Sequence, residues 1–397
     1  MLKSLDQKLQ ALHDDPSGCR EFIIADAKDA DMAFGIGAPG LSPERHDGEL
    51  RFKTLAEYRE QIRQVVHQGV VDIVLMSSST SEQLTIQERL FDDSPITPAA
   101  RANDATDIHA MRGSRVCDEP ARPFRTASID HIQCGHLDCR DEERERGATL
   151  GLYSITFNNR LECDLEALER FKEFREEAEQ KRFRYFLEVF NPNQADAVSE
   201  AQRPDFINDV IARTLAGVTS AGRPLFLKIA YQGPRAMEQL TRYDPHLIVG
   251  ILGGSAGTTL DAFQLIHEAQ QHGARVALFG RKINQAEHQL AFIQFLRHIV
   301  DGVVGPAEAV RAYHGVLQEL GIRPHRSLEE DLTLQSPELA YAGSSADRTP
   351  GNTASANGKP VAAPSSAAGR QSAVDLKSMT SEQRLAYHLD RLDRVLG

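Results

Sequence analysis

LFLKIAYQGPRAMEQLTRYDPHLIVGILGG, residues 225–254, joins two apolar runs through an amphipathic segment. The runs 225–231 and 247–252 contain almost no polar side chains, Lys228 being the main departure. Strands of a parallel sheet that are buried on both faces have this composition. Segment 234–243 has the spacing of a surface helix, so the stretch predicts a strand–helix–strand unit.

The same unit recurs along the chain. Further strands are expected at 22–26, 72–76, 96–101, 150–157, 185–190 and 275–279. Further helices are expected at 55–68, 81–90, 161–181, 204–216, 259–272 and 285–300. In 161–181 one apolar stripe is expected to contain Leu161, Leu165, Leu168, Phe171 and Phe174. Eight strands alternating with helices predict an α/β fold, a closed (β/α)8 TIM barrel, with an open doubly wound sheet as the alternative.

Three regions depart from the barrel repeat, which is expected to occupy residues 1–342. Residues 101–147 are polar and read as an insertion with one extra strand at 125–129, serving as a lid or an oligomer contact. Residues 343–376 are rich in Ser, Ala, Gly and Pro and predict a disordered linker. Residues 377–397 predict a short amphipathic helix that docks on a partner protein, folds back on the barrel or pairs with itself.

The overall composition bounds the partners. The 397 residues are 41% hydrophobic and 26% charged, with a formal net charge of −12. This charge argues against nucleic acid and anionic membranes, but it allows a small phosphorylated substrate in a local pocket. The first residues contain no apolar core of signal-peptide length, and the five cysteines are too few for a disulfide scaffold. A cytoplasmic homo-oligomer is expected.

Lys228 is the strongest chemical candidate, because it interrupts an otherwise apolar strand. A lysine snorkelling at the strand end is the structural alternative. If the side chain points into the barrel, loss of hydration favours the neutral amine. A neutral amine attacks carbonyls and forms a Schiff base that serves as an electron sink for carbon–carbon cleavage.

Two glycine-containing loops follow the last two expected strands. The loops after strands seven and eight of this barrel class commonly bind phosphate. Thr258 is expected to cap the helix that follows the first of these loops. The expected phosphate contacts are Gly254, Ser255, Ala256, Gly257, Gly280 and Arg281.

Two carboxylates lie within expected strands. Asp26 ends the first strand and Glu188 lies in the fifth, where a buried acid needs a partner. Facing the lumen, either could pair with Lys228 or move protons during imine formation. A turn residue is the structural alternative for Asp26, and a structural ion pair is that for Glu188.

With these residues in place, the chain resembles the class I (Schiff-base) aldolases, in particular the tagatose-1,6-bisphosphate aldolases and, more distantly, the archaeal-type class I fructose-bisphosphate aldolases. The matching segments are Ala25-Asp26, Tyr185–Glu188, Leu227-Lys228-Ile229, Ser255-Ala256-Gly257 and Gly280-Arg281. The resemblance implies Lys228 as the Schiff-base former, with Glu188 and Asp26 as acid/base groups. It implies a lyase of carbohydrate metabolism that makes or breaks a carbon–carbon bond of a phosphorylated sugar without a cofactor.

The sequence departs from the family in its fourth strand. The tagatose-bisphosphate enzymes have a lysine there, whereas LGLYSITFNN has none. Tyr153 and Tyr231 are the candidates for the tyrosine proton donor of the fructose-bisphosphate relatives. A bisphosphate substrate therefore does not follow, and a singly phosphorylated or sulfonated sugar fits equally well.

Three other functions stay open. HIQCGHLDC places the zinc-type ligands His131, Cys134, His136 and Cys139 within nine residues, which suggests a metal-dependent enzyme or a zinc module. A second possibility is a catalytically altered aldolase paralogue, or a sugar-phosphate-binding barrel tethered as cargo through its C-terminal helix. An epimerase or isomerase with the same phosphate site is the third, although it would not need the lysine.

Overall fold

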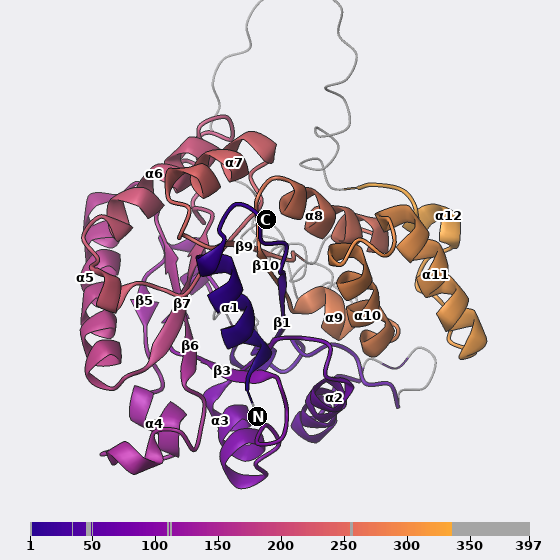
Figure 1. Cartoon of the computed structure of the whole chain (residues 1–397), viewed down its shortest axis with the longest axis horizontal. Helices are drawn as coiled ribbons and strands as arrows, with labels where there is room; N and C mark the ends of the chain where they lie inside the picture. The colour runs from indigo at the N-terminus through magenta and orange to yellow at the C-terminus, as the bar shows by residue number, and fades with distance from the viewer. Residues whose placement is uncertain are drawn as a thin grey trace, which may run out of the picture.

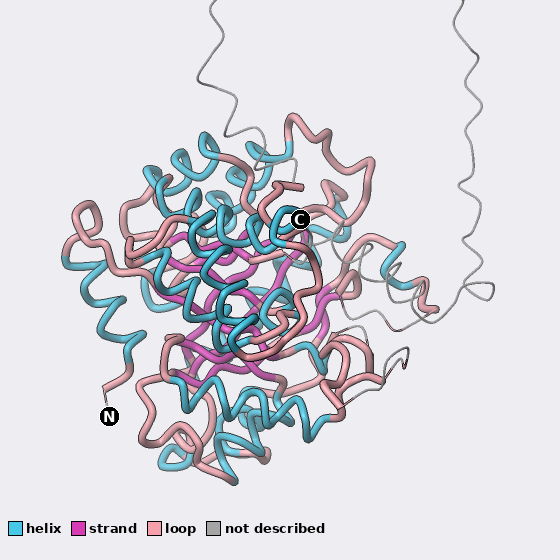
Figure 2. Tube along the Cα trace, turned by 90° about the vertical axis from the view of Figure 1, so that its right-hand side faces the viewer, coloured by secondary structure: helices cyan, strands magenta, loops and turns pink. Residues whose placement is uncertain are grey.

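Eight parallel strands close into a barrel in this computed structural model, which describes residues 2–33, 35–44, 49, 51–108, 111, 113–254 and 257–335. The barrel strands are β1 (Ile23–Lys28), β2 (Ile73–Met76), β3 (Thr97–Arg101), β6 (Leu150–Thr156), β7 (Arg184–Phe190), β8 (Leu227–Ile229), β9 (Val249–Leu252) and β10 (Val276–Phe279). Strand β1 pairs with both β2 and β10, so the sheet has no edge. The TIM barrel is confirmed and the open sheet is excluded. Figures 1 and 2 show the strands at the centre with helices around them.

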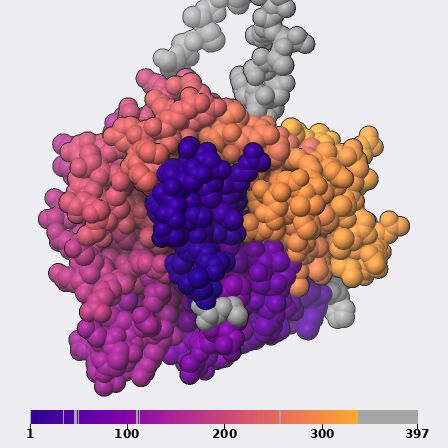
Figure 3. Space-filling view, in the orientation of Figure 1, coloured from indigo at the N-terminus to yellow at the C-terminus, as the bar shows by residue number. Residues whose placement is uncertain are grey.

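Side chains alternate between the lumen and the surrounding helices. On β1, Ile23 and Ala25 belong to the cluster that fills the lumen, whereas Ile24 packs in the outer layer between strands and helices. The amino-terminal end of the lumen is closed by α1 (Ser4–Asp14), a helix that the sequence analysis did not anticipate. Its buried Leu5, Leu9 and Leu12 join the lumen cluster, and α1 covers this end of the barrel in Figures 1 and 3.

Most expected helices are confirmed. These are α2 (Leu55–Gln68), α5 (Leu161–Gln180), α6 (Arg203–Leu215), α7 (Pro234–Tyr243) and α8 (Thr259–Gln271). The segment expected at 81–90 is instead a short α3 (Ser78–Ser81) followed by a π-helical turn, Glu82–Gln87. The segment expected at 285–300 is divided into α9 (Arg281–Gln285) and α10 (Gln289–Val300).

The prediction of an apolar stripe on α5 is confirmed only in part. Phe171 and Phe174 are buried, but Leu161 and Leu165 are 75% and 51% exposed. The buried face also includes the small residues Cys163, Ala167 and Ala178. The helix therefore turns its small side chains inward, which a count of large apolar residues overlooks.

Residues 101–147 lie in the crossover from β3 to β6, and the described part of this crossover contains an additional two-stranded sheet as well as a helix. Their helix α4 (Ile129–Cys134) packs beside α3 and the π-helical turn, where a barrel helix belongs. The extra strand expected at 125–129 is wrong in position, because β5 is Pro123–Phe124 and pairs antiparallel with β4 (Asp104–Ala105). Ile108 lines the pocket at the mouth of the barrel, and a lid or oligomer-contact role for this crossover stays a prediction.

Two further helices were missed. Helix α11 (Pro306–Glu319) packs against α8 and α10, and α12 (Leu328–Asp331) follows it. The expected linker at 343–376 and the expected helix at 377–397 lie outside the described residues. Within the described residues, every helix is too short or too polar to span a bilayer.

Candidate active site

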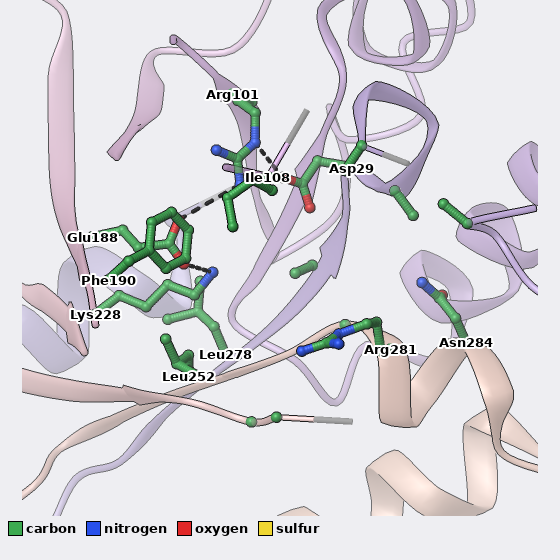
Figure 4. Close-up of a pocket in the computed structure, with 17 residues that line it drawn as sticks. Asp29, Arg101, Ile108, Glu188, Phe190, Lys228, Leu252, Leu278, Arg281 and Asn284 are labelled. Carbon is green, nitrogen blue, oxygen red and sulfur yellow. Dashed lines mark hydrogen bonds and ion pairs between the residues drawn. The ribbon is translucent and has the colours of Figure 1, made fainter. Parts of the chain in front are cut away.

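Lys228 points into the barrel from the middle of β8. Its register partner on β7 is Glu188, and partners in neighbouring strands point to the same face of the sheet. The Lys228 Nζ atom lies 2.5 Å from Glu188 Oε1, and the residues are 7% and 1% exposed. Figure 4 shows this pair at one side of the pocket, with the amine directed into the open space. The structure thus rejects the snorkelling alternative for Lys228.

The second oxygen of Glu188 is held by two residues that the sequence analysis did not single out. The Ser154 hydroxyl on β6 donates to Glu188 Oε2 at 2.6 Å. Arg101, at the end of β3, places its Nη2 atom 3.6 Å from the same oxygen and donates from Nη1 to Ser154 Oγ. Glu188 therefore meets a cation on each side, and its three partners Lys228, Ser154 and Arg101 come from the barrel strands β8, β6 and β3.

Asp29 completes the group. The Arg101 Nε atom donates to Asp29 Oδ2 at 2.6 Å, and Asp29 lines the pocket immediately after β1. Burial opposes ionisation of this carboxyl, but the charges of Arg101 and Lys228 outweigh burial and hold the pKa of Asp29 below its ordinary value. Two cations and two carboxylates are thus balanced in a small volume.

The pocket itself holds about 100 Å³ above Lys228. Gly253, Gly254, Gly280 and Arg281 line it from the ends of β9 and β10. A Cβ atom on Gly280 would lie 2.9 Å from the carbonyl oxygen of Ala27, so only glycine fits there without a shift. Backbone and guanidinium groups at this position suit an anionic substituent.

The expected phosphate loop is only partly brought together. Gly254, Gly280 and Arg281 line the pocket, whereas Gly257 lines a neighbouring cavity. Ser255 and Ala256 lie outside the described residues. Thr258 caps α8 in a reciprocal arrangement with Asp261, as expected.

Asp26 is not part of this site, so its expected role needs correction. It alternates with the lumen-facing Ala25 and Ala27 and points outward, where its Oδ2 atom pairs with Lys28 Nζ at 3.1 Å. Burial outweighs the attraction of Lys28 and raises the pKa of Asp26. Asp29 lies three residues further along the chain, immediately after β1, and is the carboxylate that lines the pocket.

The remaining candidates also lie elsewhere. Neither Tyr153 nor Tyr231 lines the pocket, and Tyr153 stacks on Phe174 outside the barrel wall, with ring centroids 4.5 Å apart. Among the described residues, no three histidine, cysteine or acidic side chains gather as metal ligands, His131, Cys134, His136 and Cys139 included. His131 and His136 use their Nδ1 atoms in local contacts, to Ser128 Oγ and to Leu137 O.

Comparisons with known proteins address the fold. No family model matches the sequence, and no curated protein matches it. The structure is similar to an archaeal fructose 1,6-bisphosphate aldolase, with 16% identity, 74% of this chain and 99% of that chain covered, and a TM-score of 0.53. It is also similar to the fructose-bisphosphate aldolase of Slackia heliotrinireducens, with 13% identity, 78% and 91% covered, and a TM-score of 0.55.

A third similar structure is an archaeal fructose-1,6-bisphosphate aldolase whose catalytic lysine is covalently bound to the carbinolamine intermediate of its substrate. It shares 16% identity over 74% of this chain and 99% of that chain, with a TM-score of 0.52. The fold is therefore an aldolase-like TIM barrel, of the kind found in Schiff-base-forming aldolases. At these identities the likeness concerns the fold.

Proposed function

We propose that the chain is a class I carbon–carbon lyase that makes or breaks a bond of an anionic sugar through an imine on Lys228. One observation supports this most directly. The buried Lys228 amine touches the Glu188 carboxylate at 2.5 Å, beneath a pocket walled by Gly253, Gly280 and Arg281. A nucleophile, a proton acceptor and an anion cradle thus share one small space.

The proposed reaction begins when Glu188 takes a proton from the Lys228 ammonium. The neutral amine attacks the substrate ketone: the carbon–nitrogen bond forms as the carbonyl π bond breaks, and a proton passes from the nitrogen to the oxygen to give the carbinolamine. Glu188 returns the proton to the carbinolamine hydroxyl, which leaves as water and yields the iminium. In cleavage, a base removes the proton of the hydroxyl on the second carbon from the iminium carbon, and that fragment leaves as an aldehyde. The electrons of the broken carbon–carbon bond form the enamine and neutralise the iminium nitrogen. Protonation of the enamine and hydrolysis then release the ketone product.

Arg101 supplies a positive charge that the fourth strand lacks. The tagatose-bisphosphate aldolases have a lysine near the start of strand four, whereas here Ser154, further along β6, meets a guanidinium that arrives from β3. Arg101 orients Glu188 and Asp29 together, since it contacts both. Asp29, ionised and facing the pocket, is the second group able to accept a substrate proton.

The substrate we propose is a singly phosphorylated or sulfonated ketose. Lys228 and Arg101 are already balanced by Glu188 and Asp29, so they add little net attraction for a second anionic group. Arg281 and the adjoining glycine backbone form one cradle in the described part of the pocket. A cavity of about 100 Å³ also suits a compact ligand.

Borohydride trapping tests this proposal. Incubation with dihydroxyacetone phosphate and borohydride should leave a reduced adduct that mass spectrometry locates on Lys228. Lys228→Ala should form no adduct, whereas the surface control Lys172→Ala should react as the unaltered chain does. An absent adduct in the unaltered chain with dihydroxyacetone phosphate, dihydroxyacetone and sulfonated analogues alike would exclude imine chemistry.

A further inference from the structure

A second cavity of about 540 Å³ adjoins the reaction pocket on the far side of Asn284. Asn284 lines both cavities, and Figure 4 places it on the opposite side of the pocket from Glu188. The walls of the second cavity come from the loop after β1, the region around α9 and the segment after α11. We call it the Lys53 pocket, lined by Gly40, Lys53, Gly257, Lys282, Glu287 and Arg326.

Lys53 is a buried cation with little compensation from the protein. It is 6% exposed, and its amine donates one hydrogen bond, to the backbone oxygen of Asn284 at 2.8 Å. No carboxylate of the described residues lies within ion-pair distance of this amine, in contrast to Lys28, which pairs with Asp26 at 3.1 Å. An ammonium has three donors, so two of them are left for a ligand or water.

The charges around Lys53 favour an anion. Burial, followed by the nearby charge of Lys28, lowers the pKa of Lys53 to about 8, while Asp26 and Glu57 act more weakly in the other direction. Lys282 and Arg326 line the same cavity, and Lys282 donates to the backbone oxygens of Gly257 and Thr258. The carboxylate of Glu287 accepts hydrogen bonds from the His325 backbone and the Tyr313 hydroxyl. The wall is therefore mainly positive, although the whole chain is acidic.

We infer that the Lys53 pocket binds a dianionic oxyanion, the phosphate group of a small phosphorylated metabolite, at a site separate from the Lys228 pocket. The anion would occupy the two remaining donors of Lys53, while Lys282 and Arg326 add positive charge to the wall of the same cavity. Its volume, several times that of the reaction pocket, leaves room for the rest of a metabolite. This inference stands independently of the proposed lyase activity, because it uses neither Lys228 nor Glu188.

Calorimetric titration with inorganic phosphate tests the inference on the full chain. The Lys53→Met variant removes the charge but keeps the length of the side chain, and it should weaken binding at this site by about 10- to 100-fold. Arg281→Ala, which alters the cradle of the reaction pocket, should leave this binding event intact. Lys172→Met is the matched control on the surface. Phosphate binding that is unchanged in Lys53→Met would overturn the inference.

The two sites can fail separately. If only Arg281→Ala loses phosphate, the cradle of the proposed function stands and the Lys53 pocket does not. If only Lys53→Met loses phosphate binding, the Lys53 pocket stands and the cradle at Arg281 does not. Glycerol phosphate that binds more tightly than inorganic phosphate would point to a metabolite, and equal affinity would point to free phosphate as the ligand.

A pH series with sulfate supplies a readout that a merely structural lysine would not give. Sulfate keeps its charge across this range, so any change comes from the protein. Affinity should fall as the pH rises through about 8, and binding near that pH should take up about half a proton, because the anion favours protonated Lys53. Glu57, whose pKa hydrogen bonding lowers to about 2, stays ionised in this range. Burial raises the pKa of Asp26 and lowers that of its partner Lys28, so the same series on Lys53→Met is the control: a pH dependence that persists there belongs to the Asp26–Lys28 pair and not to Lys53. A flat profile would contradict the role given to Lys53.

Discussion

Asp107 offers the most quantitative test of the electrostatics near the barrel mouth. Its Oδ2 atom accepts a hydrogen bond from Thr156 Oγ1 at 2.9 Å, while its buried Oδ1 atom has no hydrogen-bond partner. Burial raises the pKa of this carboxyl from 3.8 to about 6, with Glu188 adding to the rise. Folding therefore favours the protonated form of Asp107. At neutral pH the carboxyl ionises, and the free energy of unfolding is lower than at acidic pH.

The sign and size of the effect follow from linkage. A carboxyl whose pKa is higher in the folded state contributes stability at low pH and loses it as the pH rises through about 6. At 1.36 kcal/mol for each pH unit, the full loss is about 3 kcal/mol. Asp107→Asn keeps an acceptor for Thr156 and cannot ionise. Its stability relative to the unaltered chain should therefore rise by about 2 kcal/mol between about pH 4.5 and pH 8.

Urea unfolding followed by far-ultraviolet circular dichroism measures this difference, since the chain has no tryptophan to report by fluorescence. Asp130→Asn is a control of opposite sign. Arg144 and Lys181 outweigh burial and lower the pKa of Asp130, so this variant should lose stability relative to the unaltered chain only as the pH rises to about 4, and the difference should stay nearly flat from about pH 4.5 to pH 8. A difference between Asp107→Asn and the unaltered chain that stays constant with pH would refute the reasoning.

Further predictions concern the reaction pocket and the packing of the barrel. Glu188→Gln should slow imine formation by roughly 10²- to 10⁴-fold, because proton transfer at Lys228 loses its acceptor, and an unchanged rate of borohydride trapping would rule this role out. Arg281→Ala should weaken binding of dihydroxyacetone phosphate by about 10- to 100-fold but not that of dihydroxyacetone; equal losses in competition assays would argue against a phosphate contact. Gly250→Ala should cost about 1–3 kcal/mol in urea unfolding, because a Cβ atom there would lie 2.7 Å from the carbonyl oxygen of Leu227. In Gly315→Ala, on α11, the added Cβ atom meets nothing within 4 Å, so the free energy of unfolding should instead rise by about 0.4–1 kcal/mol. Similar effects of the two alanines would show that the close contact between Gly250 and Leu227 is unimportant.

The barrel could be predicted because its strands are strongly apolar and regularly spaced. Lys228 and Glu188 stand out for the same reason, since each is a charge within an apolar run. Helices α1 and α11 were missed because they lie outside the strand–helix repeat from which the barrel was predicted. Both are amphipathic with several small or polar positions, so neither has a strong apolar signal. Helix α4 is short and polar, so the crossover that contains it reads as a loop.

The site residues that were missed have a different physical origin. Asp26 and Asp29 are both acids near the end of β1, and only the alternation of the strand decides which one enters the lumen. The small residues Ala25 and Ala27 indicate which face of β1 points into the narrow interior. Asp29 continues this alternation, whereas Asp26 falls on the opposite face. Arg101 ends a strand, where a charged residue is ordinary, so nothing local in the sequence marks it as a partner of Glu188.

The long side chain of Arg101 has a consequence for how the inner walls of such barrels are compared. On the inner wall of the barrel, a long side chain from one strand can reach the residues of the adjacent strand. Arg101 of β3 does so when its guanidinium donates to Ser154 of β6. A side chain from β3 can therefore place its charge beside a carboxylate of β7, although β6, the strand between them, contains no charged residue. A comparison made position by position along one strand would overlook this contribution, because the residue that supplies the charge belongs to a different strand.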